Sequence, residues 1–250
     1  MSEMQIRPFL LLQTREDDRT QQDEYRSTLQ ISGLRKDQLH SYRLEQQRLG
    51  KIDLRKYSGI ILCGSPFTST DPEHEKTDAQ KRVEEDLHTL LDVLVAEDYP
   101  FLGACYGVGS LAIHQGALVD FTYGEAVHAI DITFTEEGRK DPLATGLPGT
   151  VKGFVGHKEA VKELPSHATL LATGQDCPVQ MFRIQENLYA TQFHPEMDFS
   201  GLAHRVRVYK HNGYFAPHEV EAIIKLVENE DVSGSHRVLT NFVNHYRQTL

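Results

Sequence analysis

Short apolar runs alternate with amphipathic helical patterns in the first half of the chain, and this alternation restricts the possible folds more than any other feature. Gly59–Cys63 is a continuous β-rich apolar run, as expected of a strand covered on both faces. Apolar residues three and four apart predict an amphipathic helix over Asp78–Asp98. Phe101–Ala104 is predicted to be the next buried strand, and Gly107–Gln115 the helix after it. Strands that alternate with helices predict an α/β fold with a parallel, right-handed, doubly wound sheet.

Patterns on either side of this segment extend the sheet. Upstream, the sequence predicts a strand, a helix and a second strand over Phe9–Gln13, Asp17–Leu29 and Gln38–Leu44. Downstream, further strands predict a mixed sheet, and a short turn joins the last two of them: Ala129–Phe134, Val179–Ile184 and Leu188–Phe193. Beyond Gly201 the chain is polar and helical. We therefore expect a mostly parallel sheet with helices on both faces.

The whole chain is expected to form one domain over residues 1–250. Its core would span about residues 5–200, and residues 201–250 would form a C-terminal helical extension. In this extension, apolar residues follow one face of each of two predicted helices, around Val220–Val227 and Val238–Tyr246.

Composition narrows the class of partner. The chain has 250 residues, of which 39% are hydrophobic and 25% charged, as in ordinary globular proteins. A formal net charge of -10 and the lack of a long Lys/Arg cluster argue against a nucleic-acid-binding face, because neutralising phosphates requires concentrated cations. No apolar run approaches the roughly 20 residues needed to cross a bilayer. A cytoplasmic location and a small-molecule substrate are therefore expected.

Neither cysteine nor histidine spacing predicts a metal site, and we expect no cofactor. The cysteines are odd in number, widely spaced and without a C-x-x-C pair, unlike a disulfide framework or a zinc pattern: Cys63, Cys105 and Cys177. Three histidines recur every seven residues, but a glycine and a proline interrupt the helix that would align them: His204, His211 and His218.

Cys105 stands where a buried strand is predicted to turn directly into a helix, within Gly103-Ala104-Cys105-Tyr106-Gly107. This is the context of a nucleophile elbow. The nucleophile of an elbow occupies a strained backbone position, and glycines two residues away on either side relieve the crowding. At the start of a helix, backbone N–H groups and the positive dipole end also favour a thiolate. The alternative is a buried structural cysteine between two glycines, but the pattern and its context favour a nucleophile.

A cysteine nucleophile needs a base, and the base needs an orienting carboxylate. His194 and Glu196 supply both just after a predicted strand, where side chains reach the carboxyl edge of an open sheet. Pro195 stiffens the link between them. The chain has 13 histidines, and a lone histidine is more often structural. The place of His194 at a strand end, in a chain that already has an elbow, favours a catalytic role.

The elbow and the segment Gln192-Phe193-His194-Pro195-Glu196 together resemble class I glutamine amidotransferases, such as the glutaminase domain of GMP synthase. Several other segments are also similar to the family: Ile61–Pro66, Gly116–Val119, Asp141–Leu143, Gly146–Pro148 and Gly156–Glu159. The resemblance spans about Phe9 to Met197 and implies the flavodoxin-like architecture of that family.

The resemblance also implies a mechanism. It assigns a triad of Cys105, His194 and Glu196 that hydrolyses glutamine through a γ-glutamyl thioester and releases ammonia. A tetrahedral oxyanion needs two convergent donors, and the resemblance places them at the backbone N–H of Tyr106 and at that of Gly64 or Ser65. The alternative for the segment around Gly64 is a plain turn.

This sequence departs from the family pattern at three positions. Gly109 stands where the family commonly has a Gln that helps to hold the substrate, so we expect that contact to be lost and space to be opened. Ser65 stands where many members have a second glycine, which a backbone donor tolerates. Glu159 replaces the Asp of an S-H-x-D segment, in which His157 and Lys158 are the candidate substrate contacts. A surface loop is the alternative for that segment.

Three functions remain open. We expect no synthetase domain in this chain, because the roughly 50 residues beyond the resemblance are too few for an ATP-binding acceptor domain. The chain would then be a glutaminase that passes ammonia to a separate synthetase. Alternatively, it is a stand-alone γ-glutamyl peptidase or transferase acting on γ-glutamyl peptides or glutathione conjugates, whose longer tail residues 201–250 resemble. The third function is that of a catalytically silent binding module, and the intact triad argues against it.

Overall fold

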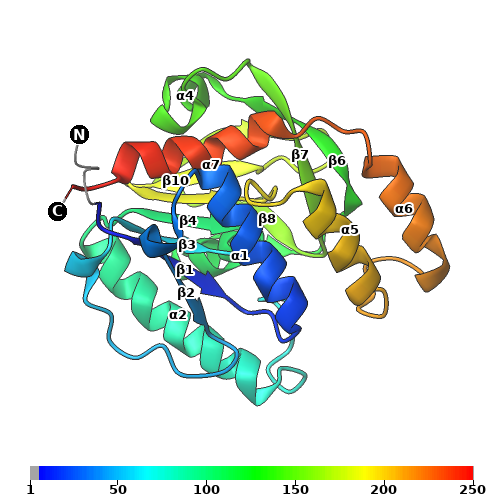
Figure 1. Cartoon of the computed structure of the whole chain (residues 1–250), viewed down its shortest axis with the longest axis horizontal. Helices are drawn as coiled ribbons and strands as arrows, with labels where there is room; N and C mark the ends of the chain where they lie inside the picture. Colours follow the sequence, from blue (N-terminus) through cyan, green and yellow to red (C-terminus); the bar gives the residue numbers. More distant parts are fainter. Residues whose placement is uncertain (1–5, 250) are drawn as a thin grey trace.

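The computed structural model describes residues 6–249 and contains a nine-stranded sheet with helices on both faces (Figure 1). The strands are β1 (Phe9–Gln13), β2 (Leu39–Arg43), β3 (Gly59–Leu62), β4 (Phe101–Ala104), β6 (Glu125–Phe134), β7 (Thr150–His157), β9 (Ala168–Thr173), β10 (Met181–Ile184) and β11 (Leu188–Thr191). Their order across the sheet is β2-β1-β3-β4-β11-β10-β9-β6-β7. The first five of these are parallel and the others antiparallel. The predicted mixed α/β sheet is confirmed.

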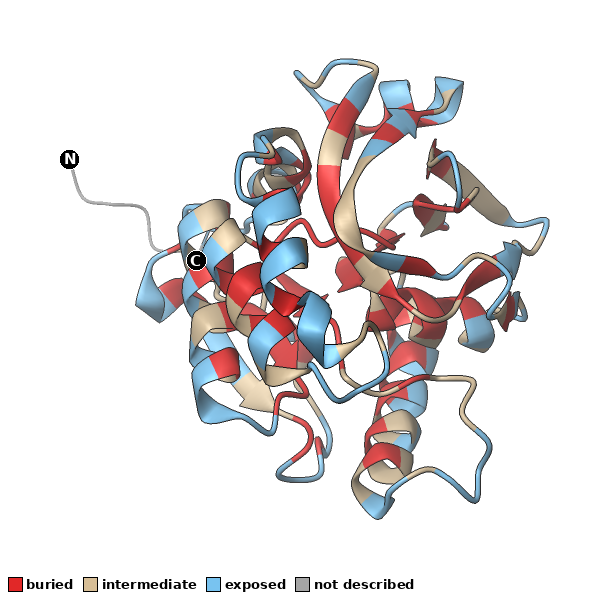
Figure 2. Ribbon diagram, turned by 90° about the vertical axis from the view of Figure 1, so that its right-hand side faces the viewer, coloured by how far each residue is buried: buried red, intermediate tan, exposed pale blue. Residues whose placement is uncertain are grey.

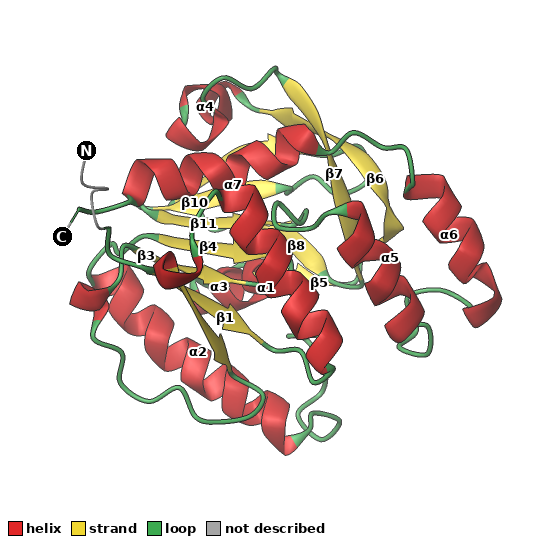
Figure 3. Cartoon of the chain, in the orientation of Figure 1, coloured by secondary structure: helices red, strands yellow, loops and turns green. Residues whose placement is uncertain are grey.

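Alternate residues of β1 serve two separate cores, one on each face of the sheet. Phe9 and Leu11 pack with α1 (Asp18–Ser32) and α7 (Ser233–Tyr246), whereas Leu10 and Leu12 pack with α2 (Asp78–Ala96) and α3 (Tyr106–His114). Figure 3 shows these helices on both sides of the strands. The continuous apolar runs of β1, β3 and β4 follow from this double cover, because both faces of each strand are buried.

The C-terminal helices pack against the central sheet. Helix α7 buries Val238, Leu239, Phe242 and Val243 against the sheet. Helices α5 (Phe199–Val208) and α6 (Val220–Val227) form a third core with residues of β6 and β7. Figure 2 shows that buried residues gather in the interior of the molecule, whereas exposed residues lie in the loops and on the outer sides of the helices. The outer bounds of the expected domain, residues 1 and 250, lie outside the described residues.

The sequence patterns did not predict several elements. These are a two-stranded sheet of β5 (Leu118–Asp120) and β8 (Ala160–Glu163), strands β7 and β9, helix α4 (Glu136–Lys140), and 3-10 turns at Lys36–Gln38, Leu54–Lys56, Pro142–Ala144 and Pro217–Glu219. Strand β9 is buried only in part, so it lacks the apolar run that marks the central strands. Within residues 6–249, no helix is both long enough and apolar enough to cross a bilayer.

Candidate active site

Cys105 forms a sharp turn between β4 and α3. Its backbone adopts φ 51° and ψ −89°, a conformation that residues other than glycine rarely hold. A Cβ at Gly103 would lie 2.8 Å from Cα of Gly107, so only glycine lets strand and helix approach this closely. The amide of Cys105 donates to the carbonyl of Thr191 at 2.7 Å, which ties the turn to β11. The local backbone is therefore that of the predicted elbow.

His194 lies three residues after the end of β11 and faces Cys105. Its amide donates to the carbonyl of Phe154 at 2.9 Å, which anchors it to β7. Its Nδ1 lies 2.7 Å from Oε1 of Glu196. Its ring lines the same cavity as Cys105, and a Cβ at Gly64 would lie 2.6 Å from Cε1 of His194 and 3.4 Å from Cβ of Cys105. The structure thus places the side chains of Cys105, His194 and Glu196 close together, which is compatible with a nucleophile, a base and an orienting carboxylate.

The surroundings of His194 and Glu196 favour the charged form of the His194 imidazole. Burial by itself would lower the pKa of His194, but the carboxylate of Glu196 and the sulfur of Cys105 outweigh it and raise this pKa to about 9. Burial would likewise raise the pKa of Glu196, but His194 and Arg205 reverse this effect and lower it to about 2. The site therefore holds an imidazolium beside a carboxylate at neutral pH.

A chain of buried charges continues behind Glu196, and the sequence patterns did not predict it. Nη1 of Arg205 lies 3.5 Å from Oε1 of Glu196, and Nη2 of Arg205 lies 2.8 Å from Oε1 of Glu24. Nε of Arg15 reaches the same Glu24 oxygen at 3.0 Å. All four side chains are buried. A buried charge is tolerated when opposite charges lie beside it, and here carboxylates and guanidinium groups alternate along the chain.

The face of α1 that meets this chain carries a sequence signal. Thr20, Glu24 and Ser27 recur at helical spacing and are buried, although each is polar. Ser27 Oγ donates to the carbonyl of Glu196 at 2.7 Å. A polar stripe on the face of a helix that packs inward indicates a buried polar network, and such a stripe is readable from sequence.

Three residues that could offer backbone N–H donors lie close to Cys105. Tyr106 is the first residue of α3, and Gly64 follows the end of β3. Among the described residues, no acceptor takes the N–H of Tyr106, Gly64 or Ser65. A Cβ at Gly64 would lie 2.6 Å from Cε1 of His194, so a side chain there would collide with the imidazole ring. This packing explains the glycine better than a plain turn does.

Two cavities meet at Cys105. One, of about 530 Å³, is mainly apolar, and Val127, Met197 and Phe215 line part of it. The other is smaller, at about 280 Å³, and is lined by Thr68, His157, Lys158 and Glu159 among others. Ser65 and Tyr214 border both cavities.

Gly109 lies against other parts of the chain rather than beside open space. A Cβ there would lie 2.6 Å from Oγ of Ser69 and 3.1 Å from Oε1 of Glu159. The expectation that Gly109 opens the pocket is therefore wrong. Its physical reason is the loop at Ser69, which fills the space that a side chain at position 109 would need.

The segment around His157 is not a surface loop, which corrects that alternative. His157 is buried, with Nε2 2.8 Å from Oε2 of Glu125 and Nδ1 2.9 Å from the carbonyl oxygen of Glu159. The carboxylate of Glu159 accepts from the amides of Ser69 and Thr70 at 2.7 and 2.8 Å. Both ring nitrogens of His157 and the carboxylate of Glu159 are thus occupied in holding the chain together.

Lys158 borders the smaller cavity. Its Nζ lies 4.9 Å from the ring centre of Tyr214, within the range of a cation–π interaction. Lys158 therefore remains a candidate to meet an anionic group of a substrate.

Gly109→Ala is expected to lower the melting temperature, because its Cβ would crowd the buried Oγ of Ser69, which has no partner among the described residues. Overpacking typically costs about 1–3 kcal/mol, or several degrees for a chain of this size. Adding Ser69→Ala should restore much of the loss, because it removes the crowded oxygen. Thermal melts of the three variants test this, and an unchanged melting temperature in Gly109→Ala would contradict the close packing.

Iodoacetamide is expected to alkylate Cys105 well before the other two cysteines. Burial raises the pKa of Cys63 well above its usual range and that of Cys177 to about 12, whereas Cys105 is part-exposed beside His194. Peptide mass spectrometry over a short time course at neutral pH measures the three rates. Equal labelling of all three would contradict a selectively reactive Cys105.

Comparisons with known proteins agree with this geometry. The family model of glutamine amidotransferase class-I matches residues 29–206. The chain is 27% identical over 165 residues to a subunit of the glutamine-hydrolyzing GMP synthase of Thermoplasma volcanium, covering 65% of this chain and 72% of that protein. It is 30% identical over 145 residues to the GMP synthase of Hamiltonella defensa, covering 56% of this chain but only 25% of that protein. The chain thus spans about a quarter of the length of the Hamiltonella defensa protein.

Solved structures share the fold. The structure of a glutamine amidotransferase from Thermotoga maritima superposes with a TM-score of 0.71 at 18% identity, covering 93% of this chain and 96% of that one. The family model matches well over half of the chain and includes the elbow, His194 and Glu196. This chain therefore belongs to the glutamine amidotransferase class-I family.

Proposed function

We propose that this protein hydrolyses the γ-glutamyl amide of glutamine with Cys105 as nucleophile. The observation that carries this proposal is the position of Cys105 on the strained turn, in one cavity with His194, whose other side is hydrogen-bonded to Glu196. The family and the names of its glutamine-hydrolyzing relatives support glutamine as substrate.

The reaction has two steps. The Cys105 thiolate attacks the amide carbon, and the oxyanion accepts hydrogen bonds from the N–H of Tyr106 and from that of Gly64 or Ser65. His194, as imidazolium, gives its proton to the leaving nitrogen, so ammonia departs and a γ-glutamyl thioester remains. Water then attacks the thioester, His194 takes its proton, and glutamate leaves while the thiolate returns.

Each remaining group has a role in these steps. Glu196 holds His194 in the tautomer and orientation that serve Cys105, through the 2.7 Å contact to Nδ1. Lys158 would meet the α-carboxylate of the substrate from the smaller cavity. The ammonia would pass to a separate synthetase, a partner that the relatives named as GMP synthase subunits favour. No cofactor is required for these steps.

A second candidate function is hydrolysis or transfer of γ-glutamyl compounds with a bulkier amine, such as γ-glutamyl peptides or glutathione conjugates. The observation that favours it is the mainly apolar lining of the larger cavity beside Cys105, because the polar amide of glutamine and ammonia need no apolar surface. Phe215 and Tyr214, which line this cavity, come from the C-terminal extension. A silent binding module is disfavoured by the assembled triad.

The deciding experiment is glutamate release by the purified protein from glutamine and from γ-glutamyl amides of small and large apolar amines. A glutaminase should show the highest kcat/KM for glutamine, whereas the second function predicts that kcat/KM rises with the apolar amine. Val127→Phe, which fills part of the larger cavity, should then lower kcat/KM for bulky amides and spare glutamine. No turnover of any substrate by the folded protein would reject both enzymatic functions.

A further inference from the structure

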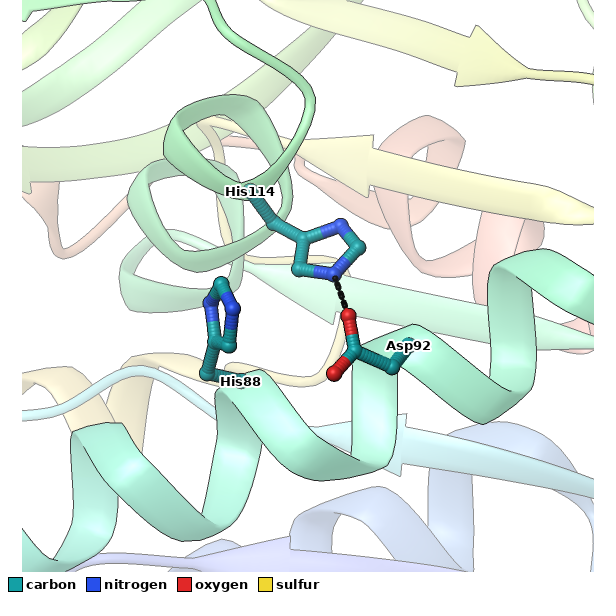
Figure 4. Close-up of side chains that lie close together, drawn as sticks. All are labelled: His88, Asp92 and His114. Atoms are coloured by element: carbon teal, nitrogen blue, oxygen red, sulfur yellow. Dashed lines mark hydrogen bonds and ion pairs between the residues drawn. The ribbon is translucent and has the colours of Figure 1, made fainter.

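Three side chains with metal-binding atoms meet between α2 and α3, at the end of α3 that lies away from the elbow. His88 and Asp92 lie on α2, and His114 is the last residue of α3. Their ligand atoms all lie within 4.8 Å of one another, and Nε2 of His114 is 2.9 Å from Oδ1 of Asp92. Figure 4 shows the carboxylate and the two rings converging from the two helices.

We propose that His88, Asp92 and His114 bind a divalent transition-metal ion of the Zn²⁺ class. Two imidazole nitrogens and a carboxylate oxygen match the ligands that zinc accepts, and three protein ligands leave one position for water. Ligands at 2.0–2.2 Å from a tetrahedral ion lie roughly 3.3–3.6 Å apart. Small rotations of the exposed His88 and Asp92 side chains would reach this spacing, including a slight widening of the 2.9 Å contact between Asp92 and His114.

The helix geometry supports this site. His88 and Asp92 are four residues apart, so they project from the same face of α2 one turn apart. The third ligand comes from the packed helix α3, and the ring centres of His88 and His114 lie 4.9 Å apart. Two ligands from one helix and one from its neighbour would tie the helices together when an ion binds.

The local charge and access suit a cation. His114 ends α3, where the helix dipole presents its negative end. The nearby ammonium group of Lys76 is already paired with Glu84 at 2.6 Å. His88 and Asp92 are exposed, and a depression of about 560 Å³ that His88 and His114 help to line gives the ion a path and room for water.

Gln115 can hold the ring of His114 in place through a hydrogen bond to Nδ1, the nitrogen that would not bind the metal. Its Nε2 lies 2.8 Å from Nδ1 of His114, and its Oε1 lies 3.1 Å from Nε2 of His167. To bind metal through Nε2, His114 must carry its proton on Nδ1. A turn of the Gln115 amide would then present Oε1 to that proton and Nε2 to His167. Gln115 would therefore keep its hydrogen bonds to His114 and His167 with or without the metal ion.

The other ligand cluster in the described part of the chain does not offer an open site. It consists of Glu125, His157 and Cys177, which are all buried. Both ring nitrogens of His157 are hydrogen-bonded, and Oε2 of Glu125 also accepts from Gln180 at 2.7 Å. These atoms are buried and already satisfy one another, whereas His88 and Asp92 of the proposed site are exposed.

The ion would stabilise the protein rather than take part in the proposed chemistry. Helix α3 has 9 residues, so at 1.5 Å per residue His114 lies roughly 13 Å along the axis from the elbow. An ion there would clamp the far end of the helix whose start carries Cys105.

Titration of the purified protein with ZnCl₂ tests this proposal, with thermal melting and isothermal calorimetry as readouts. Because a Cys105 thiolate and His194 could also take zinc, the titration uses Cys105→Ser alongside the unaltered chain. We expect one ion per chain in Cys105→Ser, and a melting temperature that rises by about 5 to 10 °C at a 100-fold excess over the dissociation constant.

The double variant His88→Ala/His114→Ala, in the Cys105→Ser background, should lose both the heat of binding and the rise. Gln115→Ala should weaken binding by about 10-fold, because it removes the outer partner of His114. His218→Ala, an exposed histidine outside the site, is the matched control and should bind as before. Zinc binding that survives the double variant, or no rise at millimolar zinc in Cys105→Ser, would overturn the proposal. Melts without zinc show that each variant is folded.

Discussion

Cys105→Ala is expected to reduce hydrolysis of γ-glutamyl amides by roughly 10⁴- to 10⁶-fold, the range seen when a covalent nucleophile is removed from such a unit. In the proposed mechanism the Cys105 thiolate forms the acyl intermediate, and neither of the other two cysteines can replace it, since Cys63 and Cys177 are buried. Steady-state glutamate release, with the best substrate from the panel, measures the loss. The melting temperature should change little, because Cys105 is part-exposed at the turn.

Cys177→Ala is the matched control for this variant. It makes the same change at a buried thiol that has no role in the proposed chemistry, so its kcat should stay near that of the unaltered protein. Quenching the unaltered protein during turnover should also trap a γ-glutamyl adduct on the Cys105 peptide. Substantial activity in Cys105→Ala, or an adduct on another residue, would reject Cys105 as nucleophile.

Glu196→Gln is expected to lower kcat by about 10³- to 10⁴-fold, as happens when the carboxylate of a triad becomes an amide. The amide can hold His194 but cannot stabilise its positive charge, so the pKa of His194 should fall from its raised value of about 9. The dependence of kcat on pH separates this effect from a loss of structure, which would lower kcat without shifting the profile. In the residual activity of Glu196→Gln, the alkaline limb of the profile should move to lower pH.

The same variant should change how stability depends on pH. The pKa of His194 is raised in the folded protein to about 9, from about 6.5 for a free histidine. The stabilisation from its charged form is therefore fully present below pH 6.5 and is lost as pH rises toward 9. Melts of the unaltered protein should decline over this window, and those of Glu196→Gln should decline less.

Glu24→Gln is the matched control for Glu196→Gln. It makes the same isosteric change in the same buried chain of charges, but on the far side of Arg205 from His194. Breaking a buried pair typically costs about 3–5 kcal/mol, so both variants should melt earlier. Only Glu196→Gln should lose most of its kcat and shift the alkaline limb. Equal losses of activity in both variants at equal folded fraction would assign Glu196 a structural role alone.

Local patterns in the sequence predicted the framework of the fold. The apolar runs of β1, β3 and β4 predicted strands covered on both faces, because a parallel strand in the middle of such a sheet has no exposed side. The ends of the strands were harder to predict. Strand β10 begins at Met181 rather than Val179, and β11 ends at Thr191 rather than Phe193, because strand ends depend on which neighbour continues to pair.

The sequence by itself determined the elbow at Cys105 and the pair of His194 and Glu196, because both depend on short-range constraints: a strained turn needs nearby glycine, and a strand end presents the residues that follow it. Only the tertiary structure decided that Ser69 fills the space beside Gly109. It also decided that Arg205 lies between Glu196 and Glu24, and that His114 meets His88 across two helices. Residues so far apart in sequence meet only through packing, and no local pattern of spacing records where their side chains will lie.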